Sequence, residues 1–85
     1  METKRHKIFI VDGSVVNLEI DKHVLQAHYS VLGFLSAAVF FEALERIIPD
    51  LILLSIDLHE MNGFEVIIKL KADKKMPIIK IIIFS

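Results

Sequence analysis

The chain has 85 residues, of which 54% are hydrophobic, and its formal net charge at pH 7 is −1. This length supports one small domain, and the near-neutral charge gives no electrostatic reason to expect a nucleic acid or an anionic membrane as partner. The lack of cysteine excludes disulfides and thiolate metal sites, and no apolar run reaches membrane-spanning length, so we expect a single cytoplasmic domain over residues 1–85.

The first segments along the chain alternate between strand and helix patterns. Residues 7–11 (KIFIV) are β-branched and aromatic and stop at Asp12 and Gly13, which predicts a strand. Ser14 can cap a helix that we expect to run to about Tyr29. The apolar residues available to face a core from this helix are Val15, Leu18, Val24 and Leu25.

The next two segments repeat this order. Residues 30–35 (SVLGFL) predict a weaker strand, interrupted by Gly33. Ser36 can cap a second helix, which we expect to end before Pro49 because a proline restricts the residue that precedes it. The apolar residues of this helix are Val39, Phe40, Ala43, Leu44 and Ile47.

The last segments complete the alternation. Residues 50–56 (DLILLSI) are apolar at successive positions, which is typical of a central parallel strand covered on both faces. Asn62 or Gly63 opens a third helix that runs to about Ala72, and residues 78–85 (IIKIIIFS) predict a fourth strand.

Strand–helix repeats with short connections predict a three-layer α/β domain with a parallel sheet. Ligands of such folds bind at the carboxyl ends of the strands. In this chain that edge gathers Asp12, Gly13, Ser55, Asp57 and Ser85, although these residues are far apart in the sequence.

Long stretches of the chain resemble the receiver domain of two-component response regulators. They are KIFIVDGSVVNLEIDKHVL, FEALERIIPDLILLSIDLHEMNGFEVIIKLKADKK and the closing strand, and the match has no obvious gap between Lys7 and Ser85. It is most specific between Pro49 and Asp73. The resemblance implies a flavodoxin-like sheet of order 2-1-3-4. It also implies a role in phosphorelay signalling, in which an aspartate at the end of the third strand accepts a phosphoryl group from a histidine kinase with the help of magnesium.

Several positions depart from the family pattern that the resemblance implies. The phosphoacceptor aspartate falls on Ser55, and the second acid of the first strand, a metal ligand in the family, falls on Gly13. A loop proline falls on His59, and a proline before the fourth strand falls on Lys80. Ser85 matches the switch hydroxyl, but the family's fifth strand, its lysine and its last two helices have no counterpart, so we expect an incomplete receiver sheet.

These departures predict a degenerate phosphorylation site. A carboxylate is ionised at neutral pH and can attack a phosphohistidine, whereas the hydroxyl of Ser55 is protonated and needs a neighbouring base. Magnesium prefers several carboxylate and phosphate oxygens, so we expect at most weak binding, at Asp12 and Asp57, and no other cofactor. We expect no enzymatic activity and little phosphoryl transfer.

Asp57 is a possible substitute acceptor. If the third strand continues, Asp57 points to the same side as Ser55, with its carboxylate displaced by about 6–7 Å. The resemblance assigns its backbone carbonyl, not its side chain, to metal binding. A solvated loop acid is the favoured interpretation, and a relocated acceptor stays open.

Other groups of residues give weaker signals. His23 and His28 are five positions apart on a predicted helix, which does not suit a zinc site. Phe40 and Phe41 fit a core better than a ligand platform. The lysines near the end of the third helix fit a solvated helix terminus better than a nucleic-acid contact. They are Lys69, Lys71, Lys74 and Lys75.

Two kinds of function follow from the sequence. One is a signalling module that has lost phosphotransfer and acts through protein partners, and the other is a receiver fragment with a structural or assembly role only. In the order 2-1-3-4 the fourth strand lies at an edge and carries Ile81, Ile82, Ile83 and Phe84. We expect a homo-oligomer joined through this strand, through uncovered sheet surface or by exchange of a terminal segment.

Overall fold

Strands and helices alternate along the chain as the sequence pattern predicts. The computed structural model of the protein describes residues 5–58 and 61–84. The elements are β1 (Lys7–Val11), α1 (Val15–Leu25), β2 (Ser30–Phe34), α2 (Ala37–Leu44), β3 (Leu51–Ser55), α3 (Gly63–Ala72) and β4 (Lys80–Phe84). All neighbouring strands pair in parallel, in the order β2-β1-β3-β4. The predicted flavodoxin-like order 2-1-3-4 is therefore confirmed.

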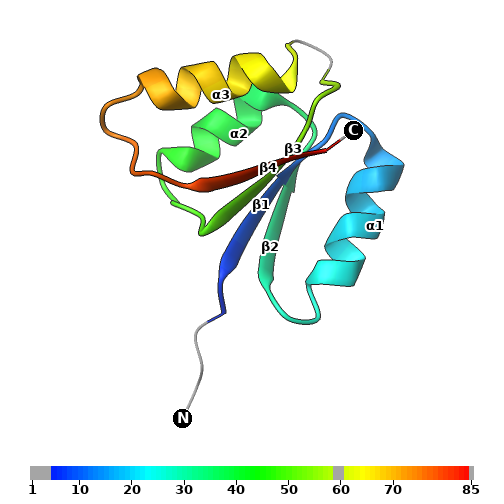
Figure 1. Cartoon of the computed structure of the whole chain (residues 1–85). Coiled ribbons are helices and arrows are strands. Elements are labelled where there is room, and N and C mark those ends of the chain that lie inside the picture. The colour runs from blue at the N-terminus through cyan, green and yellow to red at the C-terminus, as the bar shows by residue number, and fades with distance from the viewer. Residues whose placement is uncertain (1–4, 59–60, 85) are drawn as a thin grey trace.

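The helices form layers on the two faces of this sheet. Figure 1 shows α2 and α3 side by side on one face and α1 on the other. Such layers arise because each helix has to return the chain to the start of a parallel strand by a right-handed crossover. The predicted three-layer α/β architecture is confirmed.

The three helices begin where the sequence predicts. Each starts after a side chain whose oxygen accepts a backbone N–H of the first turn: Ser14 from Asn17, at 3.2 Å, and Ser36 from Val39, at 3.3 Å. Asn62 does the same for α3. These caps satisfy N–H groups that have no partner inside the helix.

The larger hydrophobic core lies between the sheet and the helices α2 and α3. Its aromatic centre joins β1, β2 and α2, since the ring of Phe9 lies 4.9 Å from that of Phe34 and 6.3 Å from that of Phe40. The buried residues of this cluster are Phe9, Val11, Phe34, Ala37, Phe40, Leu44, Ile52, Leu54, Val66 and Leu70. A smaller cluster on the α1 side consists of Ile8, Ile10 and Leu18.

Three predicted boundaries are wrong. Helix α1 ends at Leu25 and not near Tyr29, because residues 26–29 form a turn in which the N–H of Tyr29 still bonds Leu25 before the chain enters β2. Helix α2 ends at Leu44, where bonds from Glu45 and Arg46 to the residues three positions earlier tighten the last turn. Strand β4 begins at Lys80, so residues 78 and 79 lie outside it.

Three predicted core residues are also wrong. Val15, Val24 and Val39 are 58%, 63% and 52% exposed. Each helix packs only one side on the sheet, and that side is marked by Leu18 in α1 and by Phe40 in α2. Apolar residues away from this side face solvent.

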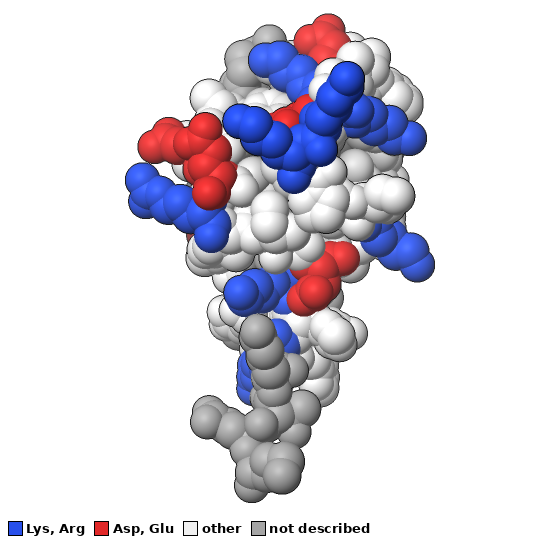
Figure 2. All heavy atoms as spheres, turned by 90° about the vertical axis from the view of Figure 1, so that its left-hand side faces the viewer, with Lys and Arg blue, Asp and Glu red and all other residues white. Residues whose placement is uncertain are grey.

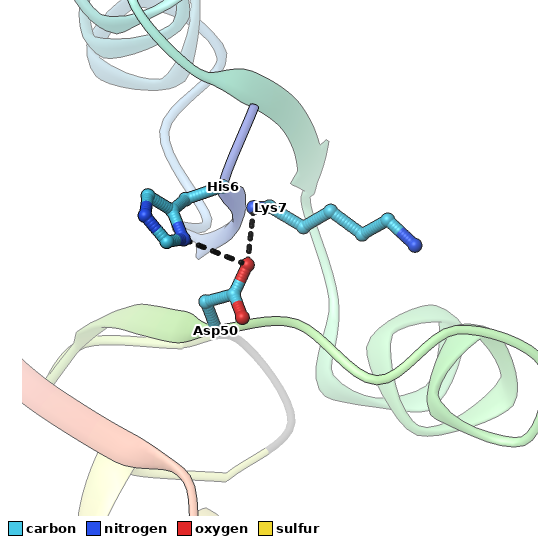
Figure 3. Close-up of polar contacts among 3 residues, drawn as sticks. All are labelled: His6, Lys7 and Asp50. Atoms are coloured by element: carbon cyan, nitrogen blue, oxygen red, sulfur yellow. Dashed lines mark hydrogen bonds and ion pairs between the residues drawn. The ribbon is translucent and has the colours of Figure 1, made fainter. Parts of the chain in front are cut away.

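The amino end of the central strand pair is fixed by Asp50 (Figure 3). Its carboxylate accepts the N–H of Lys7 at 2.7 Å, its own N–H donates to the carbonyl of Lys7 at 2.8 Å, and His6 Nδ1 lies 3.6 Å from the same carboxylate oxygen. The hydrogen bond from the N–H of Lys7 lowers the pKa of Asp50 below its ordinary value. Desolvation opposes this shift, and the charge of His6 adds a further lowering of the pKa. The exposed carboxylate therefore prolongs the β1–β3 pairing.

Candidate functional site

A groove of about 860 Å³ lies at the carboxyl edge of the sheet, beside α1. The topology brings Asp12 and Gly13, after β1, to the same groove as Ser55 and Asp57, at and after the end of β3. The other residues that line it are Ser14, Asn17, Ile20, Asp21, Val24, Leu25, Leu53, Ile82 and Phe84. The edge predicted from the sequence is thus a hollow with a polar end and an apolar body.

Asp12 is held rigidly at the polar end. It is 4% exposed, one carboxylate oxygen accepts the N–H of Ser14 at 2.9 Å, and its own N–H donates to the carbonyl of Phe34 at 3.0 Å. The first of these bonds shapes the turn that leads into α1. One of the two carboxylate oxygens is therefore committed to the backbone.

Ser55 is buried at the last position of β3. It is 6% exposed, and it pairs in register with Phe84 of β4. Gly63, the first residue of α3, packs directly on it, since a Cβ at position 63 would lie 2.8 Å from the Ser55 carbonyl oxygen. The N–H of Gly63 donates to the carbonyl of Ile56 at 2.9 Å. A glycine at this position lets α3 begin against the end of β3.

Asp57 lies beyond the strand and is exposed. Because β3 ends at Ser55, the alternation of a strand does not set the direction of the Asp57 side chain. The third strand does not continue to Asp57, so the expectation that Asp57 and Ser55 share a strand face does not apply. Both residues nevertheless line the groove.

Two of the site positions inferred from the family lie outside the described residues: Ser85, the switch hydroxyl position, and His59, the loop proline position. Lys80 is the first residue of β4. Within residues 5–58 and 61–84, no group of three or more histidine or carboxylate side chains is placed to hold a metal ion.

The sequence reasoning missed two polar residues of α1. Asn17 and Asp21 line the groove together with Asp12 and Asp57. Their spacing of four residues, in a helix that begins directly after Asp12 and Gly13, places them on one helix side and could have revealed them. Where the structure describes the groove, all the charged residues that line it are acidic.

The opposite side of the molecule has a different character. Figure 2 shows lysine and arginine side chains gathered over the side formed by α2 and α3. There the ammonium group of Lys69 lies 5.6 Å from the centre of the Phe41 ring, a cation–π contact. Phe40 is buried in the core, as predicted, and Phe41 packs against it.

No helix in the described part of the chain is both long and apolar enough to cross a bilayer.

Comparisons with known proteins agree with this fold. The family model described as the response regulator receiver domain matches residues 8–85. The chain is 30% identical over 76 residues to protein-glutamate methylesterase/protein-glutamine glutaminase 3 of Leptospira interrogans, a match that covers 86% of this chain and 22% of that protein. The chain therefore spans about a fifth of this curated relative.

Two solved receiver structures are similar over most of the chain. The N-terminal domain of a response regulator receiver protein from Methanoculleus marisnigri JR1 has a TM-score of 0.87 and 27% identity, with 94% of this chain and 66% of that chain covered. A CheY-like receiver domain protein from Methanospirillum hungatei JF-1 has a TM-score of 0.82 and 30% identity, with 94% and 63% covered. The protein belongs to the response regulator receiver domain family of two-component signalling.

Proposed function

We propose that this receiver domain does not accept a phosphoryl group and acts by associating with other proteins. The observation that carries the proposal is the buried Ser55 at the end of β3, where the family resemblance places the phosphoacceptor aspartate. A serine hydroxyl is protonated at neutral pH and needs an adjacent base to become a nucleophile. No hydrogen bond to a described histidine or carboxylate supplies such a base to Ser55.

The remaining oxygen donors do not fit a receiver-type magnesium site. Gly13 stands at the position of the second acid, and Asp12 has one carboxylate oxygen bonded to the N–H of Ser14. Asp57 is exposed beyond the strand end. Magnesium demands near-ideal octahedral oxygen geometry, so these side chains support weak binding at most.

The partner that we propose is a signalling protein and not a nucleic acid. The net charge of −1 gives no general attraction for a polyanion, and the charged residues of the described groove are all acidic. A role in cytoplasmic signalling without enzymatic activity follows from the same proposal.

The test is exposure to acetyl phosphate with magnesium, followed by intact mass spectrometry. We expect no mass gain in the unmodified chain. The matched control is the double variant Gly13→Asp/Ser55→Asp, which restores both acids. We expect this variant to gain one phosphoryl group and to show a magnesium-dependent rise in melting temperature, because the metal relieves the repulsion between clustered carboxylates.

A gain of one phosphoryl group on most molecules of the unmodified chain would contradict the proposal. Asp57→Asn then locates the acceptor. If this substitution abolishes the gain, the acceptor has moved to Asp57. If the gain persists, the acceptor is another residue, and acid lability of the adduct distinguishes an acyl phosphate from a serine ester.

A further inference from the structure

A second groove, of about 860 Å³, lies between α2 and α3, and we call it the α2–α3 groove. The buried side chains of Leu44 and Leu70 give it an apolar floor. Phe41, Ile48 and Met76 also line it, and Ile48 is 44% exposed. An apolar groove between two helices is the kind of surface that receives the apolar side of a further helix.

The α2–α3 groove lies on the face of the sheet opposite α1 (Figure 1). Helix α2 packs on β2, where the rings of Phe40 and Phe34 lie 6.1 Å apart, and α3 begins against the end of β3 at Gly63. Because the strand order is β2-β1-β3-β4, the two helices meet over the centre of the sheet and not at the β4 edge. All the residues that line the groove lie between Ala38 and Met76. The groove is thus a feature of two helices that pack side by side on the well-covered face.

The two walls of the groove differ in charge. Among the lining residues, the α2 wall carries Glu45, whereas the α3 wall and the turn after it carry Lys69, Lys75 and Asp73. One carboxylate oxygen of Asp73 accepts the N–H of Lys75 at 3.0 Å and shapes this turn. Residues 69–75 include four lysines and one acid, and Figure 2 shows lysine and arginine side chains gathered on this side of the molecule. The α3 wall is therefore basic.

The ammonium groups of these lysines have no carboxylate partner in the described part of the chain. The ion pairs found there lie elsewhere, at the start of β1 and within α1. Lysines at the end of a helix suit the helix dipole, but the dipole does not explain the position of Lys69. Its ammonium group lies 5.6 Å from the centre of the Phe41 ring, at the groove. The α3 wall thus places positive charge directly beside an apolar surface.

We propose that the α2–α3 groove binds an amphipathic helix of a signalling partner, with acidic residues along one flank. The apolar side chains of this helix contact Leu44 and Leu70 on the floor, and its carboxylates lie against Lys69 and Lys75 on the α3 wall. A helix suits the groove better than a strand does, because strand addition needs an exposed sheet edge and both walls here are helices. The proposal names the surface for the protein association proposed above, and it rests on that function.

A nucleic acid suits this groove less well. Glu45 on the α2 wall repels phosphates, and a polyanion has no aliphatic side chain to place on the leucine floor. Bases stack on free aromatic faces, whereas the ammonium group of Lys69 lies over the Phe41 ring. Basic and apolar contacts side by side therefore favour an acidic, amphipathic protein segment.

Titration of the isotope-labelled 85-residue chain with a synthetic peptide, followed by NMR, tests the proposal. The probe is a capped peptide of about 16 residues, long enough to form a helix, with leucines along one side and glutamates along one flank of that side. We expect the backbone amide signals of Phe41 and Lys69 to shift, and those of Asn17 and Asp21 in the groove beside α1 to stay unchanged. The same peptide with lysines in place of the glutamates should bind at least about tenfold more weakly, because its charges repel the α3 wall.

Charge reversal in the protein tests the α3 wall. Lys69→Glu/Lys75→Glu should weaken binding of the acidic peptide by at least about tenfold. The matched control is Lys71→Glu/Lys74→Glu, which changes the net charge equally in the same segment but at positions that do not line the groove. Because solvent and salt screen exposed charges outside the contact, this control should weaken binding by less than about threefold. Circular dichroism checks that both variants fold.

Substitution of exposed isoleucines tests the apolar part of the groove. Ile48→Ser removes an apolar side chain that lines the groove, and it should weaken binding by at least about threefold. Ile68 is 66% exposed on α3 and does not line the groove, so Ile68→Ser should leave the affinity unchanged.

Each contrary result overturns the proposal. No shift of the groove amides at millimolar peptide would show that the groove does not take an acidic helix. Equal losses in the two charge-reversal variants would show that net charge, and not the groove, attracts the peptide. Tighter binding of a single-stranded oligonucleotide would assign the groove to a nucleic acid, and the same shifts on concentrating the chain alone would assign it to a second copy. None of these outcomes depends on phosphoryl transfer, so failure here leaves the proposed loss of phosphotransfer standing.

Discussion

The two faces of the sheet have similar apolar sequences but very different burial. In β3, Ile52 and Leu54 face α2 and α3 and are fully buried, whereas Leu51 and Leu53 face the α1 side and are only partly buried. The apolar run over residues 50–56 predicts a strand covered on both faces, and among the described residues only one face is fully covered. An apolar residue in a strand therefore shows only that its side chain can be buried. Whether it is buried depends on which helices cover that face of the sheet.

The largest expected effect comes from removing an aromatic ring on the well-covered face. Phe40→Ala should lower the free energy of unfolding by about 3–5 kcal/mol, because Phe40 is fully buried between Phe9 and Phe34 and its neighbours cannot collapse into the cavity. A small domain has a total stability of about 5–15 kcal/mol, so urea denaturation should show a large fall in the midpoint of unfolding.

Leu18→Ala is the matched substitution on the α1 face. Leu18 is 5% exposed but belongs to the smaller cluster next to an open groove, so the expected loss is about 2–3 kcal/mol, at the low end for a buried leucine. Equal losses for the two variants would show that both faces are equally well packed.

The second prediction compares the two glycines at which helices approach strands. A Cβ at Gly63 would lie 2.8 Å from the backbone oxygen of Ser55, which cannot move without bending β3. Gly63→Ala should therefore destabilise the protein by about 1–3 kcal/mol. At Gly33 the nearest atoms are the side-chain ends of Leu18 and Lys22, at 2.7 and 2.9 Å, which can change rotamer.

Gly33→Ala should consequently cost less than Gly63→Ala, because only the side chains around Gly33 can move away from the added methyl group. Thermal unfolding of the two variants in parallel measures the difference. A larger loss for Gly33→Ala would mean that α1 packs on the sheet more rigidly than α3 does.

The smallest expected effect concerns the central strands that both faces share. The pKa of Asp50 is lowered in the folded protein, so its ionised form stabilises the fold above the pKa of the unfolded chain, and this contribution is lost as the pH falls through the lowered value. Asp50→Asn should lower the melting temperature slightly at neutral pH, and this difference should shrink as the pH falls below 3.8, the ordinary pKa of this group, and vanish below the lowered value. A pH-independent difference would assign the effect to hydrogen bonding alone.

The order of the elements could be predicted from local signals. Ser14, Ser36 and Asn62 are strong caps, and the β-branched runs between them exclude long helices. The ends of α1 and α2 could not be predicted, because tight turns at residues 26–29 and 45–46 end these helices without a proline or glycine. Helix ends of this kind depend on where the next strand has to begin.

The side of α1 that meets the sheet could not be predicted either. Val15, Val16, Leu18, Ile20, Val24 and Leu25 all lie on this one helix. Several sides of it are apolar, and only the contact with Ile8 and Ile10 selects the side of Leu18. For the same reason, the apolar pattern places Val15 and Val24 in the core, although both are exposed in the structure.

The part of the candidate site that lies at the strand ends could be predicted, because the topology of the sheet fixes where these ends meet. Parallel strands bring their carboxyl ends to one edge, and this is enough to bring Asp12, Gly13, Ser55 and Asp57 to one groove. The side chains that α1 contributes, Asn17 and Asp21, depend on the rotation of the helix about its axis, which the local sequence leaves open.

The pair of hydrogen bonds between Lys7 and Asp50 bears on the order in which the strands pair during folding. These residues are 43 positions apart, whereas Lys7 and Ser30, which are partners in the β1–β2 pair, are separated by a much shorter loop. Closing a loop of twice the length costs about 0.6 kcal/mol more in chain entropy, and contacts that are distant in sequence slow folding. The β1–α1–β2 unit should therefore form first and offer β1 as a template, and β3 should join it later, with Asp50 fixing the register of the last-formed central pair.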